Sequence, residues 1–172
     1  MESLYVALLR EIRLRGIHKA TCVPHPKETG RGLFISDFPH LVKCVQNGLF
    51  SGTYDTPEDV DFEHIRTEHN EDKSAATLKV MPKITAAHMN LNNFERMKVN
   101  LAFPLFSLQV LQGLFYKSEI MKHGSDPAPT EAFVLLMWKL IQPMTANVPL
   151  EGLKPGSTQE SHIKDVLEYL NQ

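Results

Sequence analysis

The stretch that decides the fold reads Gly32-Leu33-Phe34-Ile35-Ser36-Asp37-Phe38-Pro39-His40-Leu41-Val42-Lys43-Cys44-Val45-Gln46-Asn47. After the glycine, the short run Leu33–Ser36 predicts a buried strand. The run ends at Asp37, and Pro39 stands where the first turn of a helix tolerates proline. Residues from Pro39 to about Phe50 then predict a helix with an apolar inward side. The stretch therefore predicts a strand, a carboxylate and a helix in direct succession.

Asp37 and His40 are the first candidate functional residues. In α/β folds, catalytic or ligand-binding groups lie at the carboxyl ends of strands, beside helix starts. His40 follows Asp37 by three residues, so both side chains can lie at the same edge of the sheet. A structural interpretation stands beside this one, in which Asp37 caps the helix and His40 is an ordinary helix residue. Capping is favoured in this chain alone, because metal catalysis needs further carboxylates.

Composition excludes several classes of protein. The 172 residues are 42% hydrophobic and 22% charged, as in ordinary globular proteins, and allow one domain or one domain plus part of another. The net charge of -2 disfavours a stand-alone nucleic-acid binder, which usually carries a basic excess. Two cysteines, Cys22 and Cys44, fit a reducing compartment. No signal peptide or membrane-spanning run is recognisable, so nucleus or cytoplasm and no membrane partner are expected.

Upstream of the central stretch, the sequence predicts the start of an α/β domain. Apolar residues at helical spacing predict an amphipathic helix over residues 2–15, with Gly16 as its stop. Residues 17–23 predict a short strand. A sheet needs more strands than these to be stable. The N-terminal part is therefore expected to be a partial α/β unit.

Downstream of Gly52 the pattern is mostly helical. The expected helices are a short one over residues 82–89, a long one from a cap at Asn92 or Asn93 to Phe115 with a kink at Pro104, a buried apolar one over residues 132–141 capped by Thr130, and a last one lined by Ile163, Val166, Leu167 and Leu170. Pro143 is expected to break the apolar helix locally. The charged run Glu68–Lys73 is expected to be a solvated face.

Two motifs carry a family resemblance. The segment Asp37-Phe38-Pro39-His40-Leu41, with Lys43 and Asn47, resembles the aspartate-x-x-histidine segment of eukaryotic cut-and-paste transposases of the P-element and THAP-domain type. The segment Asn93–Ala102, followed by Phe106 and Ser107, is similar to the Lys/Arg-Met-x-Val-x-Leu-Ala helix of that family and its trailing serine. The two motifs occur in the family's order, and the resemblance runs from about Gly16 onward.

The resemblance implies a mainly α fold with two parts. Residues 1–51 would be a partial RNase H-like α/β catalytic domain, and residues 52–172 an all-helical GTP-binding insertion domain. Asp37 would take the place of the second of three acidic residues that hold two Mg²⁺ ions, with His40 beside it. Counterparts of the other two acidic residues and of the DNA-binding domain are missing. We therefore expect no catalysis by this chain alone, a metal at Asp37 only if missing segments complete the set, and DNA contact only through missing domains.

The resemblance also implies a degraded nucleotide site made of Ser107, Gln142 and Thr145. The family's Phe-Asp-x-x-Asn segment aligns with Ile141-Gln142-Pro143-Met144-Thr145. Gln142 replaces the carboxylate that can pair with guanine N–H groups, and Thr145 replaces the asparagine. Ser107 has a plainer interpretation as a helix-surface hydroxyl. No GxxxxGK[ST] phosphate loop is present. We expect weak or absent GTP binding and no cofactor for the chain alone, although the family uses Mg²⁺ and GTP.

Three functions remain open at this point. The first is a transposase-derived fragment that resembles the GTP-binding insertion region and is inactive alone. The second is a helical protein-interaction or assembly module that pairs with a full-length related transposase. The third, ranked last, is a residual metal-dependent nuclease.

Overall fold

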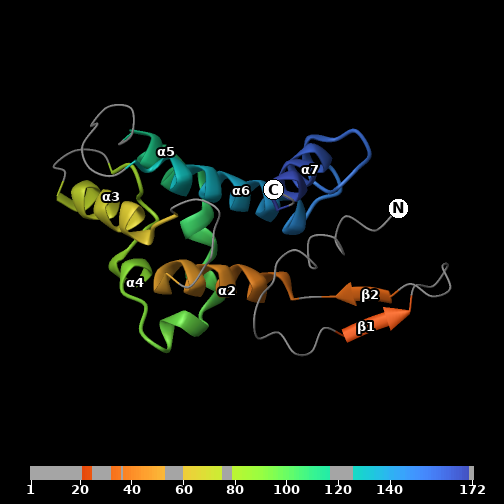
Figure 1. Ribbon diagram of the computed structural model, residues 1–172, viewed down its shortest axis with the longest axis horizontal. Helices are drawn as coiled ribbons and strands as arrows, with labels where there is room; N and C mark the ends of the chain where they lie inside the picture. Colours follow the sequence, from red (N-terminus) through yellow and green to blue (C-terminus); the bar gives the residue numbers. More distant parts are fainter. Residues whose placement is uncertain are drawn as a thin grey trace. The chain divides into compact units, whose positions relative to one another are not determined.

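The computed structural model describes residues 21–24, 32–35, 37–52, 60–74, 79–116 and 126–170, which are mainly helical (Figure 1). The strands are β1 (Thr21–Pro24) and β2 (Gly32–Ile35). The α-helices are α2 (Phe38–Ser51), α3 (Phe62–Ser74), α4 (Ala86–Met89), α5 (Leu108–Tyr116), α6 (Ala128–Met144) and α7 (Thr158–Leu170), and the 3₁₀ helices are η1 (Glu95–Met97), η2 (Val99–Leu101) and η3 (Phe103–Phe106). One compact unit is Val42–Trp138, and the other combines Met1–Leu41 with Lys139–Gln172.

The two strands form an antiparallel pair with Thr21 opposite Ile35 and Pro24 opposite Gly32 (Figure 1). Both lie where the sequence predicts strands. The helix predicted over residues 2–15 lies outside the described residues. The predicted domain division between residues 51 and 52 stays a prediction.

Helix α2 confirms the helix predicted after Asp37. Val42, Val45, Gln46 and Leu49 follow the i, i+3, i+4, i+7 spacing and are all buried, with Gln46 at 0% exposure. The helix ends before Gly52, whose φ of 62° is the left-handed conformation that glycine adopts without strain at helix ends. One polar residue therefore lies on an otherwise apolar face.

The core of the Val42–Trp138 unit is built from α2, α3, α4, η3, α5, the first part of α6 and residues of the connections beside α4 and η3. Its buried apolar side chains are Val42, Val45, Leu49, Phe62, Ile65, Met81, Ile84, Met89, Leu91, Ala102, Leu105, Phe106, Val110, Leu114, Val134 and Met137. Helices α3 and α5 are in contact, and Gly113 allows their close approach. A Cβ atom at Gly113 would lie 3.2 Å from Cγ of Met81 and 3.3 Å from Cγ of Glu68.

The long helix predicted from Asn92 to Phe115 is wrong. Asn92 Oδ1 accepts the backbone N–H groups of Phe94 and Glu95 at 3.0 and 2.9 Å, but the N-cap residue of the helix that follows is Phe94. That helix is only η1, and the chain continues as η2 and η3 before α5 begins at Leu108. Pro104 lacks the N–H that an α-helix needs there, and its ring would clash with the preceding turn. The chain bends by 46° between Val99–Phe106 and Leu108–Tyr116.

Two residues of this segment lie opposite to the expectation. The predicted long helix would have Phe94 and Met97 on its apolar, inward face, but in the structure their exposed fractions are 79% and 71%. Among the described helices, none is by itself long and apolar enough to cross a membrane, and the bent pair just described passes that length and composition test only when its two halves are combined.

Helix α6 begins earlier and ends later than predicted. Thr130 is not its cap but lies inside its first turn, since α6 starts at Ala128. Proline is tolerated in a first turn, and Pro129 therefore does not delay the helix. Pro143 does not break the helix before its end, because α6 runs one residue past it, to Met144.

The expectation of a solvated face over Glu68–Lys73 is wrong for half of the run. These residues belong to α3, and Glu68, His69 and Asp72 are buried. The carboxylate of Asp72 accepts the backbone N–H groups of Val80 and Met81 at 2.6 and 3.1 Å. Burial of a carboxylate is favourable only when such donors replace its water.

The predicted last helix is confirmed as α7, with Ile163 and Val166 buried. In this unit Lys139 of α6 forms an ion pair with Asp165 of α7 at 2.5 Å. The hydrogen bond from Lys139 lowers the pKa of the Asp165 carboxyl below its usual value.

Candidate functional site

Asp37 and His40 lie at the first turn of α2. The backbone carbonyl of Asp37 accepts the N–H of Leu41 at 3.1 Å, so Asp37 occupies the N-cap position. Both the Asp37 and the His40 side chains are exposed. In the part of the chain that the structure describes, no group of three or more His, Cys, Asp or Glu side chains is arranged to hold a metal ion. The residues around Asp37 in this part therefore do not fit a two-metal centre, which needs several carboxylates.

The two sequence motifs are joined by side chains of α2. Gln46 Nε2 donates to the carbonyl of Leu101 at 3.1 Å, and Asn47 Nδ2 donates to the carbonyl of Arg96 at 3.2 Å. The Arg96 guanidinium also lies 5.0 Å from the centroid of the Phe50 ring, within the range of a cation–π contact. The first motif thus fixes the path of the second.

Sequence reasoning missed the hydrogen bonds from Gln46 to Leu101 and from Asn47 to Arg96, which we call the amide clamp. The sequence motif includes Asn47 but assigns it no role, and Gln46 is not one of the motif residues. A signal existed, because Gln46 stands at i+4 on an apolar helical face, and a buried polar side chain must be hydrogen-bonded. The partners could not be found from the sequence, since each lies about fifty residues away along the chain.

Ser107 lies between η3 and α5, at the N-cap of α5. Its carbonyl accepts the N–H of Leu111 at 3.2 Å. Its Oγ atom is buried and has no hydrogen-bond partner among the described residues. A hydroxyl in this state can donate a hydrogen bond to a bound group or accept one from it.

Gln142 and Thr145 lie on the last turn of α6, and both are exposed. The Thr145 hydroxyl donates to the carbonyl of Ile141 at 2.8 Å, so it is engaged within its own helix. Gln142 offers a neutral amide in place of a carboxylate. This donor set does not fit a guanine base, whose paired N–H groups need a bidentate acceptor. The nucleotide roles of Ser107, Gln142 and Thr145 stay predictions.

Buried histidines form a second polar cluster, on α3 and α4. His64 Nδ1 and the Thr130 hydroxyl are hydrogen-bonded at 2.8 Å, while His88 Nδ1 accepts the N–H of Thr85 at 3.1 Å. His88 Nε2 and His69 Nδ1 are buried without hydrogen-bond partners in the described part. Burial lowers the pKa of His88, the Thr85 hydrogen bond opposes this shift, and repulsion from His69 adds to it.

We expect the free energy of unfolding to fall when the pH is lowered from about 7 to about 5, because neutral His88 is preferred in the fold. Its folded-state pKa lies below the ordinary value of 6.5, so stability is complete above that pH and is lost as the pH falls toward the folded-state pKa. Urea titrations across this range measure the change. The variant His88→Gln should show a weaker pH dependence, whereas His40→Gln should keep that of the parent. Equal slopes for the parent and His88→Gln would contradict the assignment.

Comparison with known proteins gives a family match and a structural match. The family described as TNP-like, GTP-binding insertion domain matches residues 39–151. A solved structure, the Drosophila P element transposase strand transfer complex, is similar with a TM-score of 0.64 and 21% sequence identity, which shows a shared fold. That match covers 84% of this chain and 35% of the Drosophila chain, so this chain spans about a third of it. No curated protein matches.

Proposed function

Because this chain belongs to the family of transposase-like proteins with a GTP-binding insertion domain, we propose that it is a transposase-derived insertion module that does not cut DNA by itself. The observation that carries the proposal is the family match over residues 39–151, combined with a single exposed carboxylate, Asp37, at the predicted catalytic position. Metal-assisted strand cleavage requires several converging carboxylates. β1 and β2 would then be the remnant of an RNase H-like sheet, and DNA would be reached only through other domains.

A second part of the proposal concerns the nucleotide. The family description names GTP, but Gln142 supplies no charge, and the Thr145 hydroxyl is bonded to Ile141. Of the predicted set, the Ser107 Oγ atom is the one that is buried without a hydrogen-bond partner among the described residues. A single neutral hydroxyl supports only weak binding. The module would therefore act without bound GTP.

Calorimetric titration with GTP and Mg²⁺ tests this part. We expect a dissociation constant weaker than about 0.1 mM. Gln142→Asp combined with Thr145→Asn should strengthen binding, because a carboxylate can accept two guanine N–H groups, whereas Gln112→Asp, at an exposed position of α5, should not. Micromolar affinity of the unmodified chain would overturn the proposal.

An assembly role with a full-length related transposase is the second candidate function. The exposed fractions of Phe94 and Met97 favour it, since both belong to the motif segment and neither contributes to the core. A nicking assay with supercoiled plasmid and Mg²⁺ separates both roles from a residual nuclease. Cleavage that Asp37→Ala abolishes would establish the nuclease instead.

A further inference from the structure

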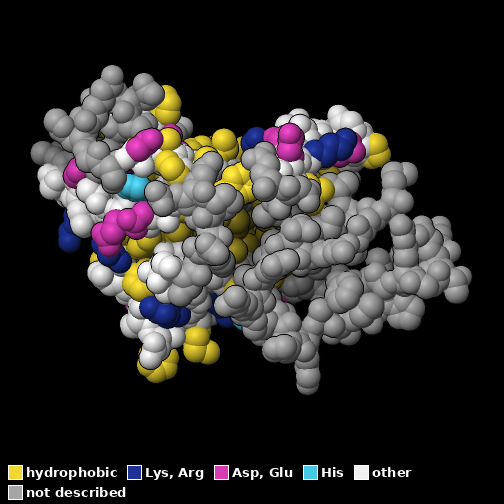
Figure 2. Space-filling view, in the orientation of Figure 1, with side chains coloured by type: hydrophobic (Ala, Val, Ile, Leu, Met, Phe, Trp, Pro, Cys, Tyr) yellow, Lys and Arg dark blue, Asp and Glu magenta, His cyan; other side chains and the backbone are white. Residues whose placement is uncertain are grey.

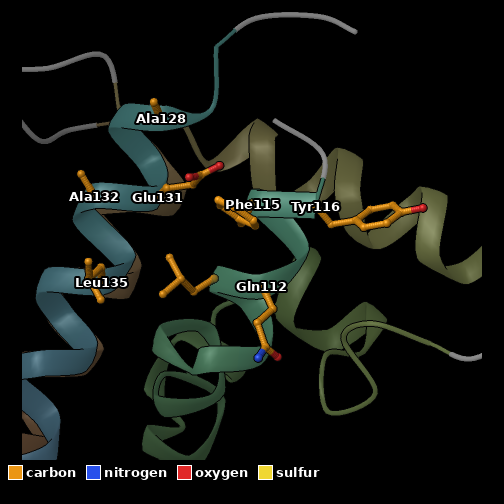
Figure 3. A pocket seen from close by; sticks show the side chains of 8 residues that line it. Gln112, Phe115, Tyr116, Ala128, Glu131, Ala132 and Leu135 are labelled. Carbon is orange, nitrogen blue, oxygen red and sulfur yellow. The ribbon is translucent and has the colours of Figure 1, made fainter. Parts of the chain in front are cut away.

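A groove runs between α5 and the first half of α6. Its volume is about 640 Å³, and it is lined by Leu111, Gln112, Phe115, Tyr116, Ala128, Glu131, Ala132 and Leu135. Figure 3 shows Phe115 and Glu131 pointing toward each other across the gap, whereas Gln112 and Tyr116 point away from α6. Hydrophobic side chains also lie at the surface over these two helices in Figure 2. The groove is therefore an open apolar trough with one carboxylate at its wall.

One oxygen of the Glu131 carboxylate, Oε1, is buried without a hydrogen-bond donor among the described residues. A buried carboxylate oxygen without a donor is costly, and a cation that reaches it gains a strong charge-assisted hydrogen bond. Phe115, directly opposite, is 58% exposed. Whatever covers this groove should bring both a cation and apolar surface.

Within the described walls of the groove, the charged side chains are acidic. Asp126 and Glu131 are acidic, and the segments 108–116 and 126–138 contain no Lys or Arg. Asp126 is already engaged, since its Oδ1 accepts the N–H of Ala128 at 3.0 Å. Of these two carboxylates, Glu131 is therefore the one that can still accept a hydrogen bond from a bound ligand.

The spacing of the lining residues suits a helix as the ligand. Ala128, Ala132 and Leu135 stand at i, i+4 and i+7 on α6, so they form one face about 10 Å long. Leu111 and Phe115 stand at i and i+4 on α5. Two such faces side by side receive a third helix whose apolar anchors repeat every three or four residues, and the small alanines allow close approach.

We infer that the groove binds an amphipathic helix of a partner protein, whose apolar face carries one Lys or Arg that meets Glu131. This interaction surface is independent of the nucleotide proposal and needs no catalytic group. The apolar anchors cover Phe115 and Leu135, and the cation sits between them.

The test uses the full 172-residue chain and a display library of helical peptides with randomised faces. Enriched peptides should share one basic residue among apolar residues at helical spacing. Glu131→Gln should weaken their binding about tenfold in fluorescence anisotropy, as expected for loss of a charge-assisted hydrogen bond. Exchange of the basic residue for norleucine should have the same effect. The matched control Glu151→Gln, at an exposed loop position, should bind as the parent does.

A second variant guards against an indirect effect on folding. Ala132→Trp places a ring in the groove at an exposed position and should abolish binding with unchanged circular dichroism, whereas Ala86→Trp, at an exposed position of α4, should not abolish it. The inference is overturned if no peptide is enriched, if enriched peptides lack a basic residue, or if binding ignores Glu131→Gln and Ala132→Trp. Light scattering that shows a dimer, converted to monomer by Ala132→Trp, would assign the groove to a second copy and overturn it as well.

Discussion

Phe106→Ala should lower the free energy of unfolding by about 3–5 kcal/mol, the usual cost of removing a buried aromatic ring. Phe106 is 1% exposed, and its ring centroid lies 6.3 Å from that of Phe133 in an edge-to-face arrangement. The truncation loses both the burial of the ring and this pairing, and it leaves a cavity beside the buried Leu105. In thermal unfolding, the melting temperature should fall by about 10 °C for a chain of this size.

Phe94→Ala is the matched control, because it removes the same side chain from the exposed position just before η1. Phe94 is 79% exposed, so the expected loss is within about 0.5 kcal/mol. Similar losses for the two variants would show that Phe106 does not hold the core as described.

Asp72→Ala should cost about 3 kcal/mol, because one buried and one part-buried backbone N–H group lose their acceptor. The carboxylate, 6% exposed, bonds Val80 and Met81 and ties the chain after α3 to the end of that helix. Met81 is itself 1% exposed, so water replaces this acceptor poorly. Urea unfolding should show a lower midpoint with an unchanged dependence on denaturant.

Two further variants locate the effect of Asp72 in its hydrogen bonds. Asp72→Asn keeps one acceptor oxygen and should recover about half of the loss. Glu71→Ala, at the exposed neighbouring position, should change stability by at most about 0.5 kcal/mol. If Asp72→Asn lost as much stability as Asp72→Ala, and Glu71→Ala lost a similar amount, the stabilising role of the Asp72 hydrogen bonds would be refuted.

The sequence predicted those elements whose periodicity is local. Helix α2 follows from the spacing of Val42, Val45 and Leu49, and α7 follows from Ile163 and Val166 in the same way. Helix α3 was missed because its inward face carries Glu68, His69 and Asp72, which a polarity pattern places in solvent. That polar face of α3 can be buried only because residues from elsewhere in the chain contact it.

The candidate site shows the same limit. The position of Asp37 at the start of α2 could be predicted, since it depends on neighbours in the chain. The amide bonds of Gln46 and Asn47 could not be predicted, because their acceptors lie on a segment predicted as a regular helix. In such a helix, the carbonyls of Arg96 and Leu101 would be bonded within the ladder and unavailable to α2.

The amide clamp marks residues 95–101 as the segment that we expect to open locally before the rest of the molecule unfolds. Short 3₁₀ turns have poor hydrogen-bond geometry and add little cohesion of their own. Residues 95–101 therefore depend for their position on contacts with other segments, among them the two amides and the Phe50 ring of α2. Release of those two amides would free this segment as a unit while the surrounding helices stay folded. The exposed Phe94 and Met97 stand at the edge of that segment, where such a local opening would enlarge the apolar surface without unfolding the protein.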